Sequence, residues 1–285
     1  MCDARVMAAA GAAALSRRQA LGAALAGGAA LLGAALGGCS SASLVPEDGG
    51  RAAPPRRLRH VRDLTHVLHP GFPTFSGEPA LLAETTTTVA EHGYFGLTLR
   101  YYEHSGTHMD APVHFDPRGA SVERLPPAEL VVPAAVVDIS ARAARDPDTA
   151  LEVDDLLAWE RRHGRLPPRA CVLVHTGWAA RAADPAAFRN PDASGRLHFP
   201  GIAPEAARWL LAERTVTGLG VDTLSLDPGR STAFETHQIW LGAGRWGLEN
   251  VAGLDEVPPC GAWLFVGAPR VAGGSGGPCR LLALW

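Results

Sequence analysis

Lysine is absent from this 285-residue sequence, and all 26 of its basic residues are arginine. This absence excludes enzymes that need an ammonium group on a flexible stem, such as Schiff-base enzymes, pyridoxal enzymes and P-loop nucleotide hydrolases. No stretch is rich in basic residues, and the net charge is -3. We therefore expect a protein that does not bind nucleic acid.

Cysteine is scarce, with five residues in the chain. Cys2 and Cys39 lie in the N-terminal segment. The other three, Cys171, Cys260 and Cys279, are too few and too scattered to form a disulfide framework for a domain of this size. No CxxC pair occurs, so a zinc site built from thiolates is not expected. The sequence does not decide whether Cys260 and Cys279 form a disulfide, which an oxidising compartment would allow.

The N-terminal segment resembles an export signal. Arg17 and Arg18 precede residues 20–38, which carry no charge and contain six glycines and eight alanines. Paired arginines before such a run resemble the twin-arginine type, and the end Leu36-Gly-Gly-Cys39 resembles a lipoprotein cleavage box. An uncleaved membrane anchor is the alternative, which the glycines disfavour.

We therefore predict an export signal at residues 1–38, a flexible tether at 39–57 and a folded domain at 58–285. Export would place the mature protein in the periplasm or cell envelope. Its only expected contact with a membrane is a lipid anchor on Cys39.

The folded domain shows the pattern of an α/β protein with a mixed sheet. Short β-branched runs predict strands at residues 84–89, 97–102, 131–139, 171–175, 215–221 and 262–266. Two stretches between them predict helices, at residues 153–162 and 204–214. The first has acidic residues at its start and arginines at its end, and the second opens with proline.

Four side chains that ligate metals gather in one short segment: His104, His108, Asp110 and His114. All their spacings are even, so an extended, gently turned segment would point the four side chains to one side. Three imidazoles and a carboxylate are costly to bury together, and a divalent cation removes that cost. Nitrogen and carboxylate ligands suit Zn²⁺ or Mn²⁺. Solvated or hydrogen-bonded histidines are the alternative.

A second group of ligands is needed, because one member of the cluster must be spared for catalysis. His237 and Glu249 are the best candidates, since they lie twelve residues apart across a glycine-rich turn. Taken alone, this pairing is a weak signal.

The segment His104-Ser-Gly-Thr-His108-Met-Asp110-Ala-Pro-Val-His114-Phe115 closely resembles the signature of the cyclase family, which includes bacterial kynurenine formamidases and isatin hydrolases. The resemblance continues along most of the domain. Further similar segments are Asp63-Leu-Thr-His66, Val172 to Trp178, Phe199-Pro-Gly201, Gly220 to Pro228, His237 to Asn250 and Gly276 to Arg280.

The resemblance implies a site with two divalent cations, Zn or Mn. His104, His108 and Asp110 would hold one cation. Asp110 and Glu249 would bridge to a second, which His237 completes, and His114 would donate and accept protons. The family's fold is a single swivelling β/β/α domain, usually found in homodimers.

Kynurenine formamidases carry tryptophan in the loop after the first strand, where it contacts the substrate. The corresponding residue here is Phe75, in Gly71-Phe-Pro-Thr-Phe75-Ser-Gly77. Phenylalanine keeps an aromatic surface for the substrate but puts N-formylkynurenine itself in doubt. Plain core packing of Phe75 is the alternative.

The expected function is hydrolysis of a small aromatic amide, either an aryl formamide such as N-formylkynurenine or a cyclic amide such as isatin. A metal lowers the pKa of bound water and so supplies hydroxide for attack on the carbonyl, with His114 as general acid and base. The alternative is an exported lipoprotein that binds a metal or a small ligand without turnover.

Overall fold

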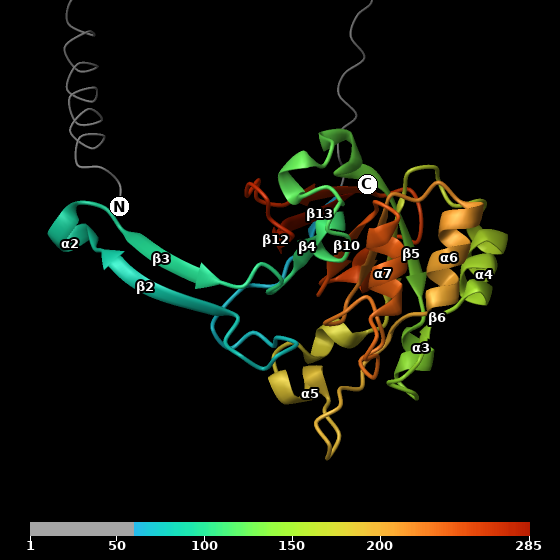
Figure 1. Cartoon of the computed structure of the whole chain (residues 1–285), viewed down its shortest axis with the longest axis horizontal. Helices are drawn as coiled ribbons and strands as arrows, with labels where there is room; N and C mark the ends of the chain where they lie inside the picture. The colour runs from blue at the N-terminus through green and yellow to red at the C-terminus, as the bar shows by residue number, and fades with distance from the viewer. Residues whose placement is uncertain (1–59) are drawn as a thin grey trace, which may run out of the picture. The chain divides into compact units, whose positions relative to one another are not determined.

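The computed structural model describes residues 60–285. A nine-stranded sheet runs through this part of the chain, in the order β1-β13-β11-β5-β7-β9-β10-β4-β12 (Figure 1). Its strands are β1 Val61–Asp63, β4 His108–Asp110, β5 Val131–Asp138, β7 Cys171–His175, β9 Gly218–Val221, β10 Trp246–Glu249, β11 Trp263–Gly267, β12 Gly276–Pro278 and β13 Arg280–Leu284. The expected α/β fold with a mixed sheet is confirmed, and the predicted export signal and tether lie outside the described residues.

The centre of the sheet is parallel and its flanks are antiparallel. β5, β7, β9 and β10 run parallel to one another, whereas β11 on one side and β4 on the other run antiparallel to their neighbours. The central strands are buried on both faces, as parallel strands usually are. Val136 and Leu173 face one hydrophobic core, and Val137 and Val174 face another.

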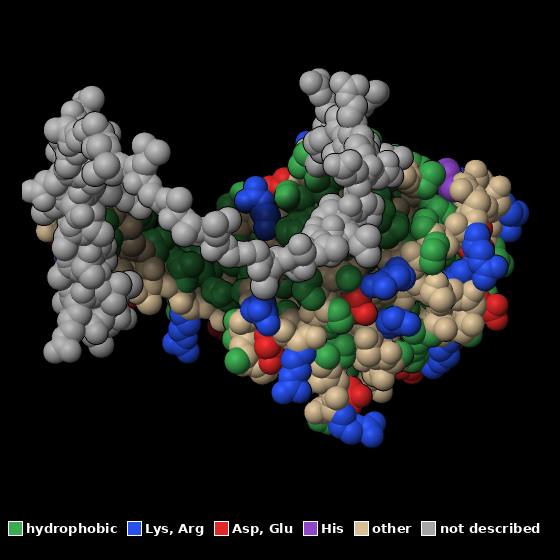
Figure 2. Space-filling model, turned by 90° about the horizontal axis from the view of Figure 1, so that it is seen from above, with side chains coloured by type: hydrophobic (Ala, Val, Ile, Leu, Met, Phe, Trp, Pro, Cys, Tyr) green, Lys and Arg blue, Asp and Glu red, His purple; other side chains and the backbone are tan. Residues whose placement is uncertain are grey.

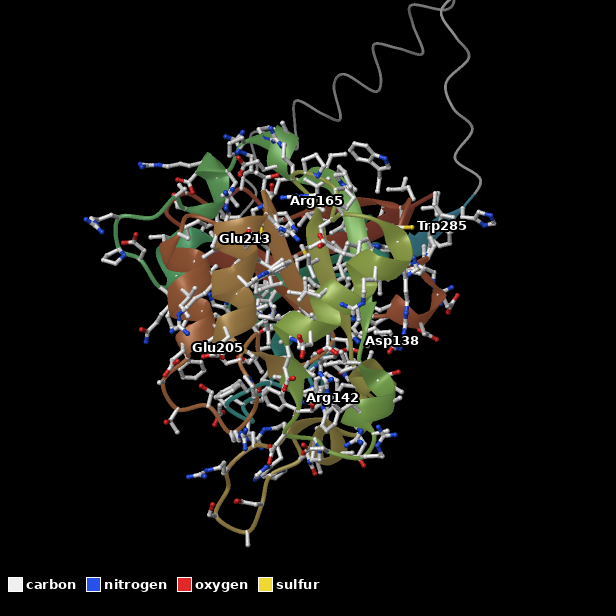
Figure 3. The ribbon with its side chains drawn as sticks, turned by 90° about the vertical axis from the view of Figure 1, so that its right-hand side faces the viewer. Asp138, Arg142, Arg165, Glu205, Glu213 and Trp285 are labelled. Carbon is white, nitrogen blue, oxygen red and sulfur yellow. The ribbon has the colours of Figure 1, made fainter. Side chains whose placement is uncertain are left out.

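The helices are α2 Val89–His92, α3 Ser140–Ala143, α4 Val153–His163, α5 Pro185–Arg189, α6 Pro204–Glu213 and α7 Glu235–Gly242. α4 and α6 lie side by side over one face of the sheet (Figure 3). Leu156 of α4 and Leu210 of α6 are fully buried in the core beneath them. Arg214, just after α6, donates two hydrogen bonds of 2.7 and 2.6 Å to Glu160 of α4 and so joins the two helices.

Both predicted helices match α4 and α6, and the predicted strands at 97–102, 131–139, 171–175 and 262–266 match β3 (Gly96–Tyr101), β5, β7 and β11. The predicted strand at 84–89 overlaps β2 (Leu81–Thr87), and the one at 215–221 is shortened to β9. Seven strands within residues 60–285 were not predicted: β1, β4, β6 (Ala150–Leu151), β8 (Gly201–Ile202), β10, β12 and β13. They were missed because none of them contains a run of β-branched residues.

β2 and β3 form a separate hairpin that extends away from the nine-stranded sheet (Figure 1). Its register places Leu81 opposite Tyr101 and Ala83 opposite Leu99, so one face of the hairpin is apolar. Leu97 on the same face is 47% exposed and Leu99 is 50% exposed. Hydrophobic side chains are visible along the hairpin in the view from above (Figure 2).

Cys171, Cys260 and Cys279 are all free, so the disulfide that the sequence left open is not formed in this structure. Cys171 and Cys279 are buried, and Cys260 is exposed. Within residues 60–285, no helix combines the length and the apolar character that crossing a membrane requires.

Candidate metal centre

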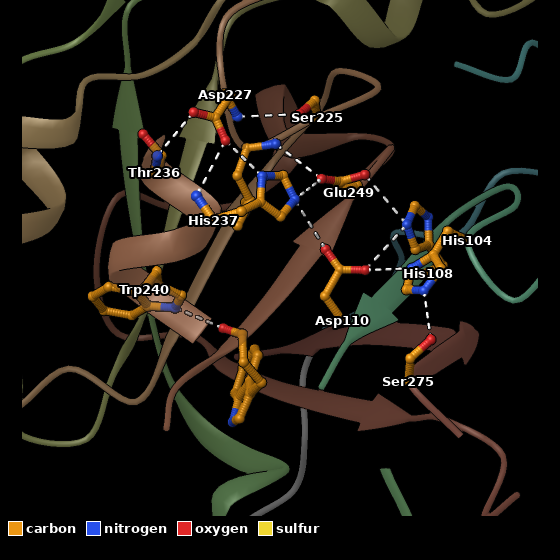
Figure 4. Close-up of polar contacts among 12 residues, drawn as sticks. His104, His108, Asp110, Ser225, Asp227, Thr236, His237, Trp240, Glu249 and Ser275 are labelled. Atoms are coloured by element: carbon orange, nitrogen blue, oxygen red, sulfur yellow. Dashed lines mark hydrogen bonds and ion pairs between the residues drawn. The ribbon is translucent and has the colours of Figure 1, made fainter. Parts of the chain in front are cut away.

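Two strands and one helix bring together residues that lie far apart in the sequence. β4 carries His108 and Asp110, β10 carries Glu249, and α7 carries His237 (Figure 4). β4 and β10 are antiparallel neighbours, and their register places Glu249 opposite His108. Gly247 lies opposite Asp110, where a Cβ atom would stand only 3.3 Å from Asp110 Oδ2. Glycine at this position therefore leaves room for the carboxylate.

The first cluster of predicted ligands is not one extended segment. Gly106 has a φ of 65°, in the left-handed region, and turns the chain between His104 and β4. A 3-10 turn that begins at Pro112 carries His114. The expectation of a continuous extended segment is therefore wrong, because glycine and proline break it on both sides of β4. The side chains still meet, since the rings of His104 and His114 stack with their centroids 3.8 Å apart.

The potential ligand atoms form two groups that share Asp110. In one group, Asp110 Oδ1 lies 2.6 Å from His104 Nδ1 and 3.4 Å from His108 Nε2. In the other, His237 Nε2 lies 2.9 Å from Glu249 Oε1 and 3.5 Å from Asp110 Oδ2. Within each group, the atoms offered lie within 4.8 Å of one another. The structure thus brings together all five residues that were predicted as ligands.

The outer nitrogens of two of these histidines are held by groups that can only accept hydrogen bonds. His108 Nδ1 lies 2.9 Å from the carbonyl oxygen of Gly106, and His237 Nδ1 lies 2.6 Å from Asp227 Oδ2. Each Nδ1 must therefore carry the hydrogen and donate it. In a neutral ring, Nε2 is then left with its lone pair, which points at the carboxylates of Asp110 and Glu249.

This arrangement requires positive charge between the rings and the carboxylates. His108 Nε2 and Asp110 Oδ2 are buried and have no hydrogen-bond partner among residues 60–285. Burial acts to lower the pKa of His108, but its contacts with Asp110 and Glu249 outweigh burial and raise the pKa to about 10. Burial likewise opposes, but does not prevent, a rise in the pKa of His237 caused by its three carboxylate neighbours. A divalent cation supplies the same charge, and this set of nitrogen and oxygen donors fits Zn²⁺ or Mn²⁺.

His114 stands beside both groups and belongs to neither. Its ring stacks on that of His104 and meets the edge of Phe115 at 4.8 Å between centroids. Burial lowers the pKa of His114 to about 4, and the negative charge of Asp110 opposes this shift without cancelling it. The ring is therefore neutral at pH 7, with a nitrogen free to accept a proton.

A cavity of about 620 Å³ opens onto the centre, with His104, His114, His237 and Glu249 in its wall. The rest of the wall is mostly aromatic or apolar and includes Phe75, Tyr102, Phe115, Leu224 and Phe234. The ring of Phe75 lies 5.8 Å from that of Phe234, and Phe75 is 41% exposed. Phe75 thus lines the cavity and is not a buried core residue.

Four residues around the site were not predicted from the sequence: Asp227, Ser275, Phe115 and Phe234. Asp227 lies within the segment Gly220 to Pro228, which resembled the family, but nothing in the residues indicated a partner for His237. Ser275 lies 2.9 Å from His104 across a separation of 171 residues. Only the folded chain reveals such contacts.

Comparisons with known proteins identify the family of the chain. A family model described as Putative cyclase matches residues 62–228. The chain is 34% identical over 241 residues to an isatin hydrolase of Roseibium aggregatum, which covers 79% of this chain and 91% of the relative. It is 29% identical over 208 residues to a kynurenine formamidase of Paracidovorax citrulli, covering 70% and 85% of the two chains.

Solved structures show the same fold. Isatin hydrolase A from Ralstonia solanacearum matches with a TM-score of 0.74 and 40% identity, over 79% of this chain and 91% of that one. An isatin hydrolase bound to the product analogue thioisatinate matches with a TM-score of 0.74 and 31% identity, over 79% and 92%.

Proposed function

The chain belongs to the cyclase family and is an isatin hydrolase-like, metal-dependent hydrolase; we propose that it hydrolyses a small aromatic amide. The observation that carries this proposal is the orientation of the imidazoles of His108 and His237. Both direct Nε2 at carboxylates, in a buried pocket that opens into an aromatic cavity.

Two divalent cations, Zn or Mn, would be held in this pocket. His104, His108 and Asp110 would hold one, and Asp110, His237 and Glu249 would hold the other. When bound, such cations lower the pKa of water towards 7 and polarise the substrate carbonyl. Asp110 and Glu249 offset part of the added charge and fix the positions of the histidines around them.

His114 moves the proton in the proposed reaction. Its neutral ring, between His104 and Phe115, faces the cavity and is not needed as a ligand. As water attacks the carbonyl carbon, a nitrogen of His114 accepts a proton from it. The same proton is then donated to the amide nitrogen, which leaves poorly unless it is protonated. The C–N bond breaks to give an amine and a carboxylic acid, and the acid releases its remaining proton to solvent as it becomes a carboxylate.

The cavity supports an aromatic substrate. Phe75, Phe115 and Phe234 line it together, and the rings of Phe115 and Phe234 lie 6.1 Å apart. Aromatic side chains pack favourably against a planar ring in offset-stacked or edge-to-face arrangements. We propose either an aryl formamide such as N-formylkynurenine or a cyclic amide such as isatin, in agreement with the names of the relatives.

Turnover assays with the Zn²⁺- or Mn²⁺-loaded protein test the function. We expect hydrolysis of isatin, formanilide or N-formylkynurenine, followed by absorbance. His114→Ala should lower kcat by about 10² to 10⁴-fold and leave cation binding intact, because general acid-base catalysis contributes about that much. A protein that holds cations but turns over none of these amides would support the rival function, a binding protein without turnover. The rival function requires, in addition to this absence of turnover, that His114→Ala leaves the affinity for every ligand unchanged.

The expected homodimer and the export of the chain remain proposals. The apolar face of the β2–β3 hairpin, with Leu97 and Leu99 half exposed, is a surface that a second copy could cover. Light scattering should give twice the chain mass, and Leu97→Ser with Leu99→Ser should reduce it to a monomer. Fractionation of cells should find the wild-type chain in the envelope and an Arg17→Gln, Arg18→Gln variant in the cytoplasm.

A further inference from the structure

His104 differs from the other ligand candidates in how its outer nitrogen is held. Its Nε2 lies 2.9 Å from the hydroxyl oxygen of Ser275 (Figure 4). That hydroxyl lies 2.6 Å from Glu103 Oε2, which also accepts the backbone N–H of Ser275 at 3.0 Å. Glu103, Ser275 and His104 thus form a continuous chain of hydrogen bonds that ends at the metal centre.

The direction of this chain is fixed by its chemistry. An ionised carboxylate only accepts hydrogen bonds, so the single hydroxyl hydrogen of Ser275 goes to Glu103. The Ser275 oxygen can then only accept, and His104 Nε2 must carry a hydrogen and donate it. In the neutral ring, Nδ1 keeps its lone pair. That lone pair faces Asp110 Oδ1 at 2.6 Å, where two acceptors repel each other unless a cation or a proton lies near them.

The backbone around Ser275 is built to hold it in this place. Gly276 is paired with Asp110 in the β12–β4 ladder, and the carbonyl of Ser275 accepts the backbone N–H of Ala111 at 2.8 Å. A Cβ atom on Gly274 would lie 2.8 Å from Glu103 Oε1, so glycine there allows the carboxylate to approach. Backbone hydrogen bonds therefore join Ser275 to the strand that carries Asp110, and they fix the position of its hydroxyl group.

We propose that Glu103 and Ser275 are positioning residues for the metal centre. They hold His104 with its hydrogen on Nε2 and its Nδ1 lone pair towards Asp110, and so strengthen binding of the cation that His104, His108 and Asp110 would share. Partners of this kind keep a ligand histidine in one tautomer, and their loss typically weakens metal affinity by about 10 to 100-fold. The inference rests on the proposed function only in assuming that cations bind.

The hydrogen bond between Ser121 and Glu123 provides a control for the substitutions of Ser275 and Glu103. Ser121 donates to Glu123 Oε1 at 2.8 Å, which makes a second serine–glutamate hydrogen bond, and no histidine is bonded to either side chain. Val122, between them, donates its backbone N–H to Gly274 at 3.0 Å, and neither substitution removes that bond. Ser121→Ala and Glu123→Gln therefore remove the same kind of contact without removing a hydrogen bond to His104, Glu103 or Ser275.

The test measures cation affinity by competition between the full-length protein and a chromogenic chelator for Zn²⁺. Ser275→Ala should weaken binding of one of the two cations by about 10 to 100-fold. Glu103→Gln should weaken it less, because the amide oxygen can still accept the serine hydroxyl. The double variant should lose no more than Ser275→Ala alone, since both residues act through one hydrogen bond. The Ser121 and Glu123 variants should bind as the wild type does.

A spectroscopic measurement separates positioning from general destabilisation. In the Zn²⁺-loaded protein with ¹⁵N-labelled histidine, we expect His104 to show a hydrogen on Nε2, and its proton signal should move upfield in Ser275→Ala. Zinc dissociation constants that Ser275→Ala leaves unchanged, or that Ser121→Ala changes equally, overturn the inference. A hydrogen on Nδ1 of His104 in the loaded wild type also overturns it.

Failure of the proposed function is distinguishable from failure of this inference. A wild-type protein that binds two cations but hydrolyses no amide contradicts the proposed function, while the affinity comparison still decides the roles of Glu103 and Ser275. A wild-type protein that binds neither Zn²⁺ nor Mn²⁺ contradicts both.

Discussion

The metal centre has two halves, one around His237 and the other around His104, and each half holds its histidine in a different way. His237 is held by a direct bond to Asp227, a carboxylate that is 2% exposed and that also accepts the backbone N–H of His237. His104 lies on a turn and is held through Ser275 by Glu103, both of them only partly buried. A direct buried carboxylate is a stronger partner than a serine relay, because less water competes with it. We therefore expect the half that contains His237 to bind its cation more tightly.

Loss of Asp110, which both halves share, should have the largest effect, because both halves should then lose their cations. Asp110 contributes one oxygen to each group of ligand atoms. Asp110→Asn should remove both cations and reduce turnover by at least about three orders of magnitude, because metal catalysis accounts for several kcal/mol of barrier lowering. Metal analysis of the purified variant, together with steady-state kinetics, checks this. Retention of either cation would show that the halves do not share Asp110.

Asp227 and Ser275, the partners of the outer histidine nitrogens, should each affect one cation. Asp227→Asn keeps the size of the side chain but places an amide hydrogen against His237 Nδ1, or else costs one of the backbone hydrogen bonds from Thr236 and His237. We expect about 100-fold weaker binding of the tighter cation, the upper end for such partners. Ser275→Ala should affect only the weaker cation. Equal effects of Asp227→Asn and Ser275→Ala on the same cation would contradict the proposed division.

The pH should change the cation affinity of both halves of the centre. The raised pKa values of His108 and His237 mean that, without a cation, both rings hold protons at neutral pH. A cation must displace these protons, so affinity should rise with pH between 6 and 8 and binding should release protons. Calorimetry in two buffers of different ionisation enthalpy measures the protons released. A release of none would contradict the directions of these pKa shifts.

A substitution in the cavity wall should have the smallest effect on turnover and cation binding. Phe75 contacts Phe234 and Phe199 by its ring but touches no ligand candidate. Phe75→Leu should raise KM for an aromatic amide a few-fold and leave kcat and cation content unchanged, because it removes binding that is equal in the ground and transition states. Steady-state kinetics at saturating Zn²⁺ provide the measurement, and a large fall in kcat would place Phe75 closer to the chemistry than the geometry does.

The sequence carried the identities of the ligand candidates but little of their geometry. His104, His108 and Asp110 are close in the chain, and His237 with Glu249 formed a weak candidate pair that the family resemblance supported. Nothing in the residues shows that β4 and β10 pair in the register that sets Glu249 against His108. That register depends on the assembled sheet, which long-range contacts determine.

The partners of the histidines were beyond sequence reasoning for the same reason. Ser275 is 171 residues from His104, and a serine in a glycine-rich stretch gives no sign of a role. The helices α4 and α6 could be predicted because their capping residues and apolar faces are local signals. Short strands such as β12 carry no such signals.

The most direct test of the centre is a crystal structure of the protein soaked in Zn²⁺ or Mn²⁺, with anomalous scattering data. We predict two anomalous peaks that flank Asp110, one among His104, His108 and Asp110, and the other among Asp110, His237 and Glu249. No peak beside Asp110, or cations bound only elsewhere on the chain, would contradict the account.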